Sequence, residues 1–518
     1  MISEKKADEI RPEQEDMTGR DKMVSNILTS WGVHLFIIIV GFIMPRIIDR
    51  HVGQISLGIW DFCWSFVNYL SLTGLGVGSS VNRYVALFRA VGDTEGLSKS
   101  VSSVVIIQLI ISLFIILGTV SIALLLPVYF AERLGSELGV ARWVVTLLGT
   151  SLAVQMAFDT SRGIMTGCHR WDINNGINAA SHVITAIIMF IALLLGGGLK
   201  SLGLIYLGVV TLTEVVRTIL AHRVCPEVQV SLRYANKEQA RQMFLFGIKS
   251  IIASSPQLIL VQTTNIFVGI MLGPASLAVF SRPIALVRNM ETLINRFAHV
   301  LTPTAASLEG KGRDDELRDF FLSSTKYGVA FTLPMVIMMI AFGDIILGLW
   351  MGPAYANGKV LSILAMGYFL PVAQGSTMKI LMGLNLHGRV GWFNLVICVC
   401  TFVCGVLLLN ISNWTLVKLA MLIAIPLTLS NGIFIPIYTC KKLGITIKEY
   451  LRYVFLVPLA CGGIFAGCLM VSRFSFHDNS TASFVFGGVF GTIVLGTLYW
   501  QYLFSLRLRM QIHKMVRR

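Results

Sequence analysis

Residues 101–126 read VSSVVIIQLIISLFIILGTVSIALLL, a run without a single charged side chain. The hydrocarbon core of a bilayer is about 30 Å thick, and about 20 apolar residues of α-helix are enough to cross it. Within lipid, backbone amides and carbonyls must form hydrogen bonds inside their own segment, so the run is predicted to be a transmembrane helix. This stretch places the chain among membrane proteins.

Similar apolar runs follow one another along the whole chain. The composition agrees, because 55% of the residues are hydrophobic and 13% are charged, against about 25% charged in soluble domains. We therefore predict an all-α polytopic membrane protein with about fourteen transmembrane helices. The predicted spans are 25–46, 57–82, 101–126, 142–167, 174–196, 202–221, 244–271, 276–301, 327–350, 360–383, 391–411, 415–439, 453–472 and 483–506.

The polar segments between these spans are short, and none is long enough to bury a core of its own. We expect no catalytic domain outside the membrane, no enzymatic activity, and no cofactor or metal. Cys400 and Cys404 share a helix face, but no His or carboxylate accompanies them, which favours packing over metal binding. The predicted parts are a tail (1–24), a six-helix bundle (25–222), a connection (223–243), a second six-helix bundle (244–440), and two further helices with a basic tail (441–518).

The net charge of +15 is unevenly distributed along the chain. If the N-terminus is cytoplasmic, the inside loops carry most of the Lys and Arg, which is the asymmetry that sets membrane topology. Both termini are then cytoplasmic, and the charge is explained without nucleic-acid binding. The inside clusters include Arg83, Arg89, Lys99, Arg223, Arg233, Arg241, Lys311, Arg313, Arg318, Lys441, Lys442, Lys448, Arg452, Arg517 and Arg518.

An internal repeat is visible at a shift of 220 residues. Six spans separate the copies, and because six is even, both copies have the same orientation, related by an axis along the membrane normal. Two such bundles facing each other across a central cleft are typical of transporters. Gly53, Ser56, Leu57, Ala86, Gly92 and Leu97 fall on Gly273, Ser276, Leu277, Ala306, Gly312 and Leu317.

The eighth span is unusually charged for a membrane helix. Arg282, Asn289 and Arg296 are spaced by seven residues and share one helix face. Arg288 lies near mid-span, and Glu291 follows it at the i, i+3 distance at which the two side chains can pair. Because charges at membrane depth are costly, this face is predicted to line water or protein. The alternative is that each arginine pairs with a carboxylate on a neighbouring helix.

Other ionisable residues within the spans are weaker candidates. Lys249 either faces the cavity or extends to the interface, and His34 and Asp61 bind substrate, relay protons or satisfy a neighbour. Asp159 and Arg162 are spaced to form a pair on the fourth span, and Glu214 and Arg217 repeat this spacing on the sixth span, where a structural role is expected. Coupling to a proton is assigned as a hypothesis to the intramembrane carboxylates.

The arginines outnumber the free carboxylates in these spans, so an electropositive cleft is predicted. Guanidinium groups stay charged and bind phosphate in a bidentate manner, which favours an anionic cargo with a pyrophosphate group. Arg282, Arg288, Arg296, Lys249 and His34 are the predicted substrate-binding residues. Asp61, Asp159, Arg162 and Glu291 are the predicted coupling or pairing residues.

Several short motifs near the start of the chain match the opening of a known family. They are Pro45-Arg46-Ile47-Ile48-Asp49-Arg50-His51-Val52-Gly53, Ser56-Leu57-Gly58-Ile59-Trp60, Leu72-x-Gly74-Leu75-Gly76, Arg83-Tyr84 and Arg89-x-x-Gly92-Asp93. With these motifs the chain resembles, over essentially its whole length, bacterial polysaccharide flippases of the multidrug/oligosaccharidyl-lipid/polysaccharide exporter superfamily. The drug-exporting branch usually has twelve spans, so the two extra spans favour the polysaccharide branch.

The resemblance implies a V-shaped bundle that moves an undecaprenyl-pyrophosphate-linked oligosaccharide across the bacterial cytoplasmic membrane by alternating access. It also implies a groove on the last two helices that holds the lipid tail. The expected partners are lipid-linked oligosaccharide and membrane lipid, with a polysaccharide polymerase or glycosyltransferases as further partners, and the protein is expected to be a monomer. A cation-coupled multidrug exporter and a flippase of lipid-linked peptidoglycan precursor are the alternatives.

Overall fold

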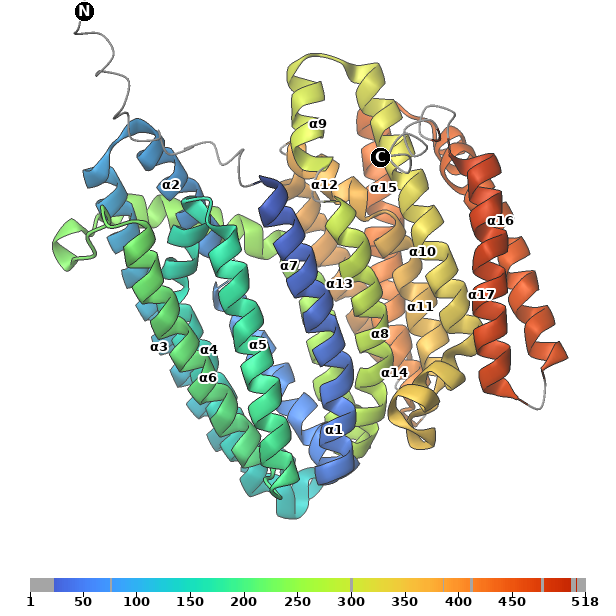
Figure 1. The fold of residues 1–518 in the computed structure, drawn as a ribbon, viewed down its shortest axis with the longest axis horizontal. Helices are drawn as coiled ribbons and strands as arrows, with labels where there is room; N and C mark the ends of the chain where they lie inside the picture. Colours follow the sequence, from blue (N-terminus) through green and yellow to red (C-terminus); the bar gives the residue numbers. More distant parts are fainter. Residues whose placement is uncertain are drawn as a thin grey trace, which may run out of the picture. The chain divides into compact units, whose positions relative to one another are not determined.

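The described part of the chain is helical throughout. The computed structural model describes residues 23–504 except 75–76, 299–300, 385, 410–412 and 477–478, together with Arg509. These ranges contain α-helices, short 3-10 helices and two π-helical segments, and no strand (Figure 1). Ten helical segments in them are long and apolar enough to cross a membrane, and one, Thr94–Gly167, contains two helices. The predicted all-α membrane fold is confirmed, and the count of fourteen spans stays a prediction.

The chain divides into two compact units. One unit contains Met1–Ile47, Leu70–Pro127 and Arg142–Ser250, and the other contains Ile48–Tyr69, Val128–Ala141 and Ile251–Arg518. Two stretches from the first half of the sequence therefore pack with the second half. The predicted boundaries of two six-helix bundles and a terminal pair stay a prediction.

In the first unit, helices pack closely through small residues. The hydroxyl of Ser112 donates to the carbonyl of Ala153 at 2.8 Å, and a Cβ at Gly149 would lie 2.2 Å from Oγ1 of Thr119. Small residues allow such close approach in membrane helices, where the lipid provides no hydrophobic drive for association. The helices of this part of the sequence are α2 (Val77–Val91), α3 (Thr94–Leu134), α4 (Leu138–Gly167), α5 (Trp171–Leu194) and α6 (Leu199–Val224), of which the end of α3 and the start of α4 belong to the second unit.

The remaining helices carry the chain to its C-terminal end. A loop containing a 3-10 turn, η3 (Leu232–Tyr234), precedes them. The helices are α7 (Lys237–Leu272), α8 (Pro274–Ala298), α9 (Leu301–Gly310), α10 (Asp314–Met351), α11 (Gly358–Ala373), α12 (Gly375–Gly383), α13 (His387–Leu409), α14 (Leu416–Leu427), η5 (Thr428–Phe434), α15 (Ile435–Leu443), α16 (Ile447–Ser475), α17 (Ser480–Leu498) and η6 (Tyr499–Leu503). The shorter turns are η1 (Leu72–Gly74), η2 (Gly135–Glu137) and η4 (Pro353–Tyr355).

The last two long helices pack against α10 in the second unit. Phe465 and Leu469 of α16 form a buried cluster with Phe342 of α10 and with Leu495 and Tyr499. Figure 1 shows α16 and α17 as neighbours, in agreement with their contacts. The hydroxyl of Tyr499 is buried and donates to the carbonyl of Ala330 at 2.6 Å. The polar group of this tyrosine is therefore hydrogen bonded inside the apolar cluster.

Two glycine turns of the backbone match under the 220-residue shift, and the repeat of two six-helix bundles stays a prediction. Helix α1 (Met23–Ser71) bends at Gly53, whose φ is 86°, and Gly273, 220 residues later, has a φ of 84° immediately before α8. Gly92 and Gly312 form a second such pair, with φ values of 71° and 64°. These left-handed conformations favour glycine, which has no Cβ to clash. The copies therefore share turns as well as residues.

Candidate functional site: polar side chains along α8

The central feature of α8 is a buried arginine held by a carboxylate. Arg282 donates from Nη2 to Oδ2 of Asp61, which lies on α1 after its bend. The side chains are 5% and 17% exposed, respectively. A charge buried at this depth is costly unless it is paired, and the two residues neutralise each other. Arg282 thus follows the alternative in which an arginine of this helix pairs structurally.

The contact between α1 and α8 is close along its length. The side-chain amide of Gln54 donates to the carbonyl of Ala275 at 3.3 Å. A Cβ on Gly58 would lie 1.8 Å from the carbonyl oxygen of Pro274, so the two backbones touch there. With the Arg282–Asp61 pair, these contacts join stretches that are equivalent under the 220-residue shift. The two copies of the repeat therefore meet along residues 54–61 and 274–282.

A second acidic residue of α1 is also hydrogen bonded. The hydroxyl of Tyr355 in η4 donates to Oδ1 of Asp49 at 2.6 Å, and Tyr355 is 2% exposed. The same tyrosine lies within electrostatic range of both Asp61 and Arg282. The short turn after α10 is thereby fixed beside the ion pair. The sequence did not single out Tyr355, because its partner lies about 300 residues earlier.

Further along α8, the charged residues are arranged differently. Oε2 of Glu291 accepts a hydrogen bond of 2.7 Å from the side-chain amide of Gln257 on α7. Arg288 is exposed, and no carboxylate of the described residues forms an ion pair with it. The Arg288–Glu291 pair that the spacing allows is therefore absent from the described residues. Asn289 is partly buried. Among the described side chains of α8, Arg288 is the arginine that is open to a ligand.

Three predicted substrate-binding residues have side chains outside the described residues. His34 lies on α1, Lys249 on α7 and Arg296 near the end of α8. The structure describes the helices that carry them and does not describe their side chains. Their predicted role stays a prediction.

The predicted pairs of the first unit are confirmed. On α4, Nη1 of Arg162 lies 3.3 Å from Oδ1 of Asp159. On α6, Nη1 of Arg217 lies 2.5 Å from Oε1 of Glu214, and both side chains are almost completely buried. Arg217 also donates to the side-chain oxygen of Asn178 on α5 at 2.7 Å.

These two pairs form one cluster, because Glu214 and Arg217 lie within electrostatic range of both Arg162 and Asp159. The sequence predicts each pair from its i, i+3 spacing. It gives no signal that the pairs of α4 and α6 lie close together. The cluster carries two positive and two negative groups, and its charges balance.

The charges on the described part of α8 and its partners also balance. Arg282 and Arg288 are matched in number by Asp61 and Glu291, so a positive excess there depends on Lys249 and Arg296. The described residues provide one exposed guanidinium, Arg288, on a helix whose other described charged side chains, Arg282 and Glu291, are each held by a partner. Within the described ranges, no group of three or more His, Cys, Asp or Glu side chains is arranged to hold a metal ion.

Comparison with known proteins identifies relatives of the chain. A family of polysaccharide biosynthesis proteins matches residues 89–358, which is more than half of the sequence. The uncharacterized membrane protein EpsK of Bacillus subtilis (strain 168) is 19% identical over 445 residues, which cover 84% of this chain and 85% of EpsK.

Solved structures with the same fold are membrane transporters. An inward-facing multidrug resistance transporter of the MATE family, in the MOP superfamily, has a TM-score of 0.65 at 16% identity and covers 80% of this chain and 94% of its own. The lipid II flippase MurJ, in an inward closed conformation, has a TM-score of 0.68 at 13% identity and covers 92% and 100%. A MOP superfamily transporter from Pyrococcus furiosus has a TM-score of 0.60 at 16% identity and covers 83% and 96%. At such low identity these matches establish the fold alone. The family match to residues 89–358 confirms the resemblance to polysaccharide biosynthesis proteins.

Proposed function

Because the chain belongs to the family of polysaccharide biosynthesis proteins, we propose that it is a flippase for a polyprenyl-pyrophosphate-linked oligosaccharide. In this proposal the protein moves the oligosaccharide from the inner to the outer leaflet of the bacterial cytoplasmic membrane by alternating access, for surface polysaccharide biosynthesis. It acts as a transporter without catalysing a reaction, and both of its termini are cytoplasmic.

The observation that carries this proposal is the exposed Arg288 on α8. A charged side chain on an apolar membrane helix costs free energy, and the binding of an anion at this position would offset that cost. Guanidinium binds two phosphate oxygens at once and remains charged at every physiological pH. Lys249, Arg296 and His34, the other substrate-binding residues predicted from the sequence with Arg282 and Arg288, are proposed to complete the diphosphate site.

The energy for transport is proposed to come from the membrane potential or from a coupled ion. The sequence contains no GxxxxGK[ST] loop to hold a nucleotide phosphate. Moving one elementary charge across the membrane releases about 2.3 kcal/mol per 100 mV. A cargo with a negatively charged diphosphate is therefore driven outward by a potential that is negative inside.

The proposal is tested with purified protein in proteoliposomes. The probe is a polyprenyl diphosphate that carries a disaccharide with a nitrobenzoxadiazole label, and dithionite measures its arrival in the outer leaflet. We expect Arg288→Ala to slow flipping about ten- to hundredfold, because a hydrogen-bonded charge contact of about 1.5–3 kcal/mol is lost. Arg288→Lys should retain part of the rate, since it keeps the charge and loses the bidentate geometry.

The matched control is Arg313→Ala, in which an exposed arginine of the α9–α10 connection loses a surface ion pair with Glu316. Such pairs contribute little, so the control should flip the probe at the wild-type rate. Unchanged flipping by Arg288→Ala at normal protein levels would remove the role given to this residue.

If wild-type protein transports a cationic dye and does not transport the diphosphate probe, the result would instead support a multidrug exporter. Preference for a peptidoglycan precursor over the disaccharide probe would support the other alternative. The fold does not separate these possibilities, since MATE and MurJ structures match it with similar TM-scores.

A further inference from the structure

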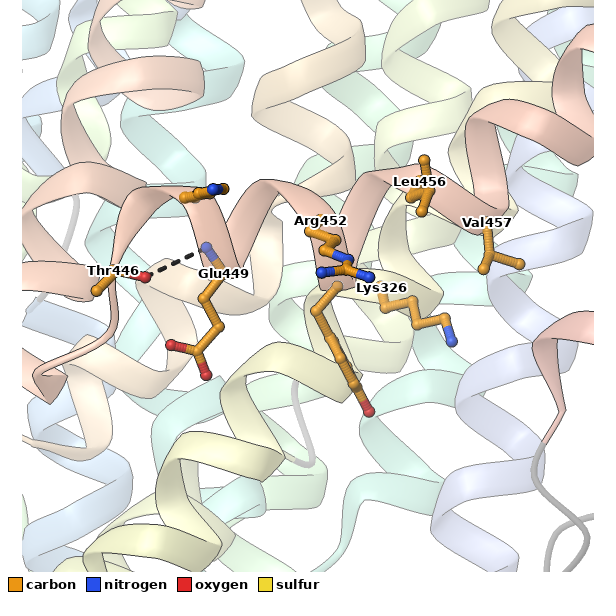
Figure 2. A pocket seen from close by; sticks show the side chains of 8 residues that line it. Lys326, Thr446, Glu449, Arg452, Leu456 and Val457 are labelled. Atoms are coloured by element: carbon orange, nitrogen blue, oxygen red, sulfur yellow. Dashed lines mark hydrogen bonds between the residues drawn. The ribbon is translucent and has the colours of Figure 1, made fainter.

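A pocket lies where the start of α16 meets α10, away from the residues of α8. It has a volume of about 480 Å³, and Figure 2 shows its side chains. Both helices belong to the second unit. The residues that line the pocket are Lys326, Thr446, Lys448, Glu449, Arg452, Tyr453, Leu456 and Val457.

Three of these side chains are cationic, and they come from two helices. Lys448 and Arg452 stand one turn apart on α16, and Lys326 reaches the pocket from α10. Nζ of Lys326 lies 5.3 Å from the centre of the Tyr453 ring, close enough for a cation–π interaction. Lys326 is partly buried, so its ammonium is held at this place by the packing of its stem.

The positive charge of the pocket is not neutralised by its own residues. Glu449 is the acidic residue among those that line it, which leaves an excess of two positive charges. Figure 2 shows the carboxylate of Glu449 turned away from Arg452. Among the described residues, no carboxylate forms an ion pair with Lys326, Lys448 or Arg452. Three cations that line one pocket favour an anion with several oxygens.

The other side of the pocket is apolar and leads into the membrane-spanning part of α16. Leu456 and Val457 line it, and Leu456, Leu459 and Ile464 continue as exposed apolar side chains at 60%, 47% and 50%. Tyr453 is also exposed, and tyrosines of this kind gather at the headgroup level of membranes. The pocket therefore joins a cationic end to a stripe that acyl chains can cover.

We propose that this pocket binds the phosphate headgroup of an anionic bilayer phospholipid, with an acyl chain along Leu456, Leu459 and Ile464. Arg452 binds phosphate oxygens through its planar guanidinium, and the two lysines act as point charges. Membrane topology explains basic residues in the α15–α16 connection. It does not explain why a lysine of α10 lines the same pocket together with Leu456 and Val457.

The test uses purified protein in nanodiscs and native mass spectrometry of retained lipid. Nanodiscs of phosphatidylcholine alone are compared with nanodiscs that contain phosphatidylglycerol. We expect wild-type protein to retain phosphatidylglycerol selectively. The double variant Lys326→Gln/Arg452→Gln should bind it about thirtyfold more weakly, since each basic residue near an anionic surface increases the affinity about fivefold.

Two further variants distinguish the pocket from general surface charge. Lys441→Gln/Lys442→Gln removes two neighbouring charges outside the pocket and should keep the selectivity. The exchange Lys326→Arg/Arg452→Lys keeps both charges and should retain most of the binding, which separates loss of the site from loss of folding. Equal loss in the Lys441/Lys442 variant would overturn the proposal.

The source of the phosphate is tested by competition in detergent. Inorganic phosphate or pyrophosphate should not displace phosphatidylglycerol at millimolar concentration, because neither carries a chain for the apolar stripe. Displacement by either would make this a site for free phosphate and overturn the proposal. Stronger binding of the labelled polyprenyl diphosphate, lost in the same double variant, would make it a site for the cargo and would also overturn it.

Discussion

Arg282 and Asp61 form a buried ion pair between two nearly equivalent positions of the internal repeat. Under the 220-residue shift Asp61 falls on Ser281, the residue beside Arg282. The pair joins α1 to α8, where the Gly58–Pro274 backbone contact also lies. Arg282, which the sequence assigns to the cargo, therefore has a neutralising partner, and we expect it to hold the two repeats together.

Removal of one partner of this pair should destabilise the protein strongly. Asp61→Asn or Arg282→Gln leaves a buried charge without its counter-charge, which costs about 3–5 kcal/mol of the free energy of unfolding. The expected result is a lower midpoint of thermal unfolding in detergent for each single variant. The exchange Asp61→Arg/Arg282→Asp should recover part of the loss. Single variants as stable as wild type would show that the pair contributes no stability.

The backbone contact at Gly58 makes a second prediction. In Gly58→Ala the new Cβ would lie 1.8 Å from the carbonyl oxygen of Pro274, so the two helices must move apart. Overpacking of this kind costs about 1–3 kcal/mol or more, and thermal unfolding measures it. Gly208→Ala on α6 is the matched control, because no atom lies within 4 Å of its Cβ, and alanine favours a helix by about 1 kcal/mol. Equal destabilisation in both variants would contradict the close approach.

The turn before α8 depends on its backbone conformation. Gly273 has a φ of 84° and open space around its Cβ position, so a substitution meets strain without a clash. Gly273→Ala should cost about 1–2 kcal/mol, and Gly273→Asn should cost less, because asparagine tolerates the left-handed region better. The midpoint of thermal unfolding should be highest for wild type, lower for Gly273→Asn and lowest for Gly273→Ala. The reverse order of Asn and Ala would mean that side-chain packing, and not φ, determines this position.

Much of the fold follows from local patterns in the sequence. The apolar runs predict the helices, because lipid leaves no other way to satisfy the backbone. The shift between Gly53 and Gly273 predicts two copies with equivalent turns, and the i, i+3 spacing predicts the pairs Asp159–Arg162 and Glu214–Arg217. Each of these signals depends on residues near each other in sequence, or on identity at a constant shift.

The arrangement of the site depends on contacts that the sequence does not encode locally. The partner of Arg282 lies 221 residues earlier, and its spacing within α8 says nothing about which helix it meets. Glu291 binds Gln257 of α7 instead of Arg288, because a neighbouring helix offers an amide. One signal was available: in a repeat whose copies meet face to face, Asp61 falls next to Arg282 under the shift. Counting charges in the sequence does not show that Arg282 and Arg288 are matched in number by Asp61 and Glu291, and the predicted positive excess depends on Lys249 and Arg296.

The Glu214–Arg217 pair provides a test of whether buried charges in the first unit serve transport or structure. Both side chains are at most 3% exposed, and Arg217 also binds Asn178. Arg217→Ala leaves Glu214 unpaired and should destabilise the protein by about 3–5 kcal/mol.

The double variant Glu214→Leu/Arg217→Met removes both charges and keeps the volume, so its stability should be close to that of wild type. If the cluster is structural, this variant should also flip the diphosphate probe at the wild-type rate in proteoliposomes. Arg162→Gln is the comparison, because its side chain is 42% exposed and its pair should contribute about 1 kcal/mol or less. A stable double variant that no longer transports would overturn the structural role, because the charges of Glu214 and Arg217 would then be needed for a step of transport and not for folding.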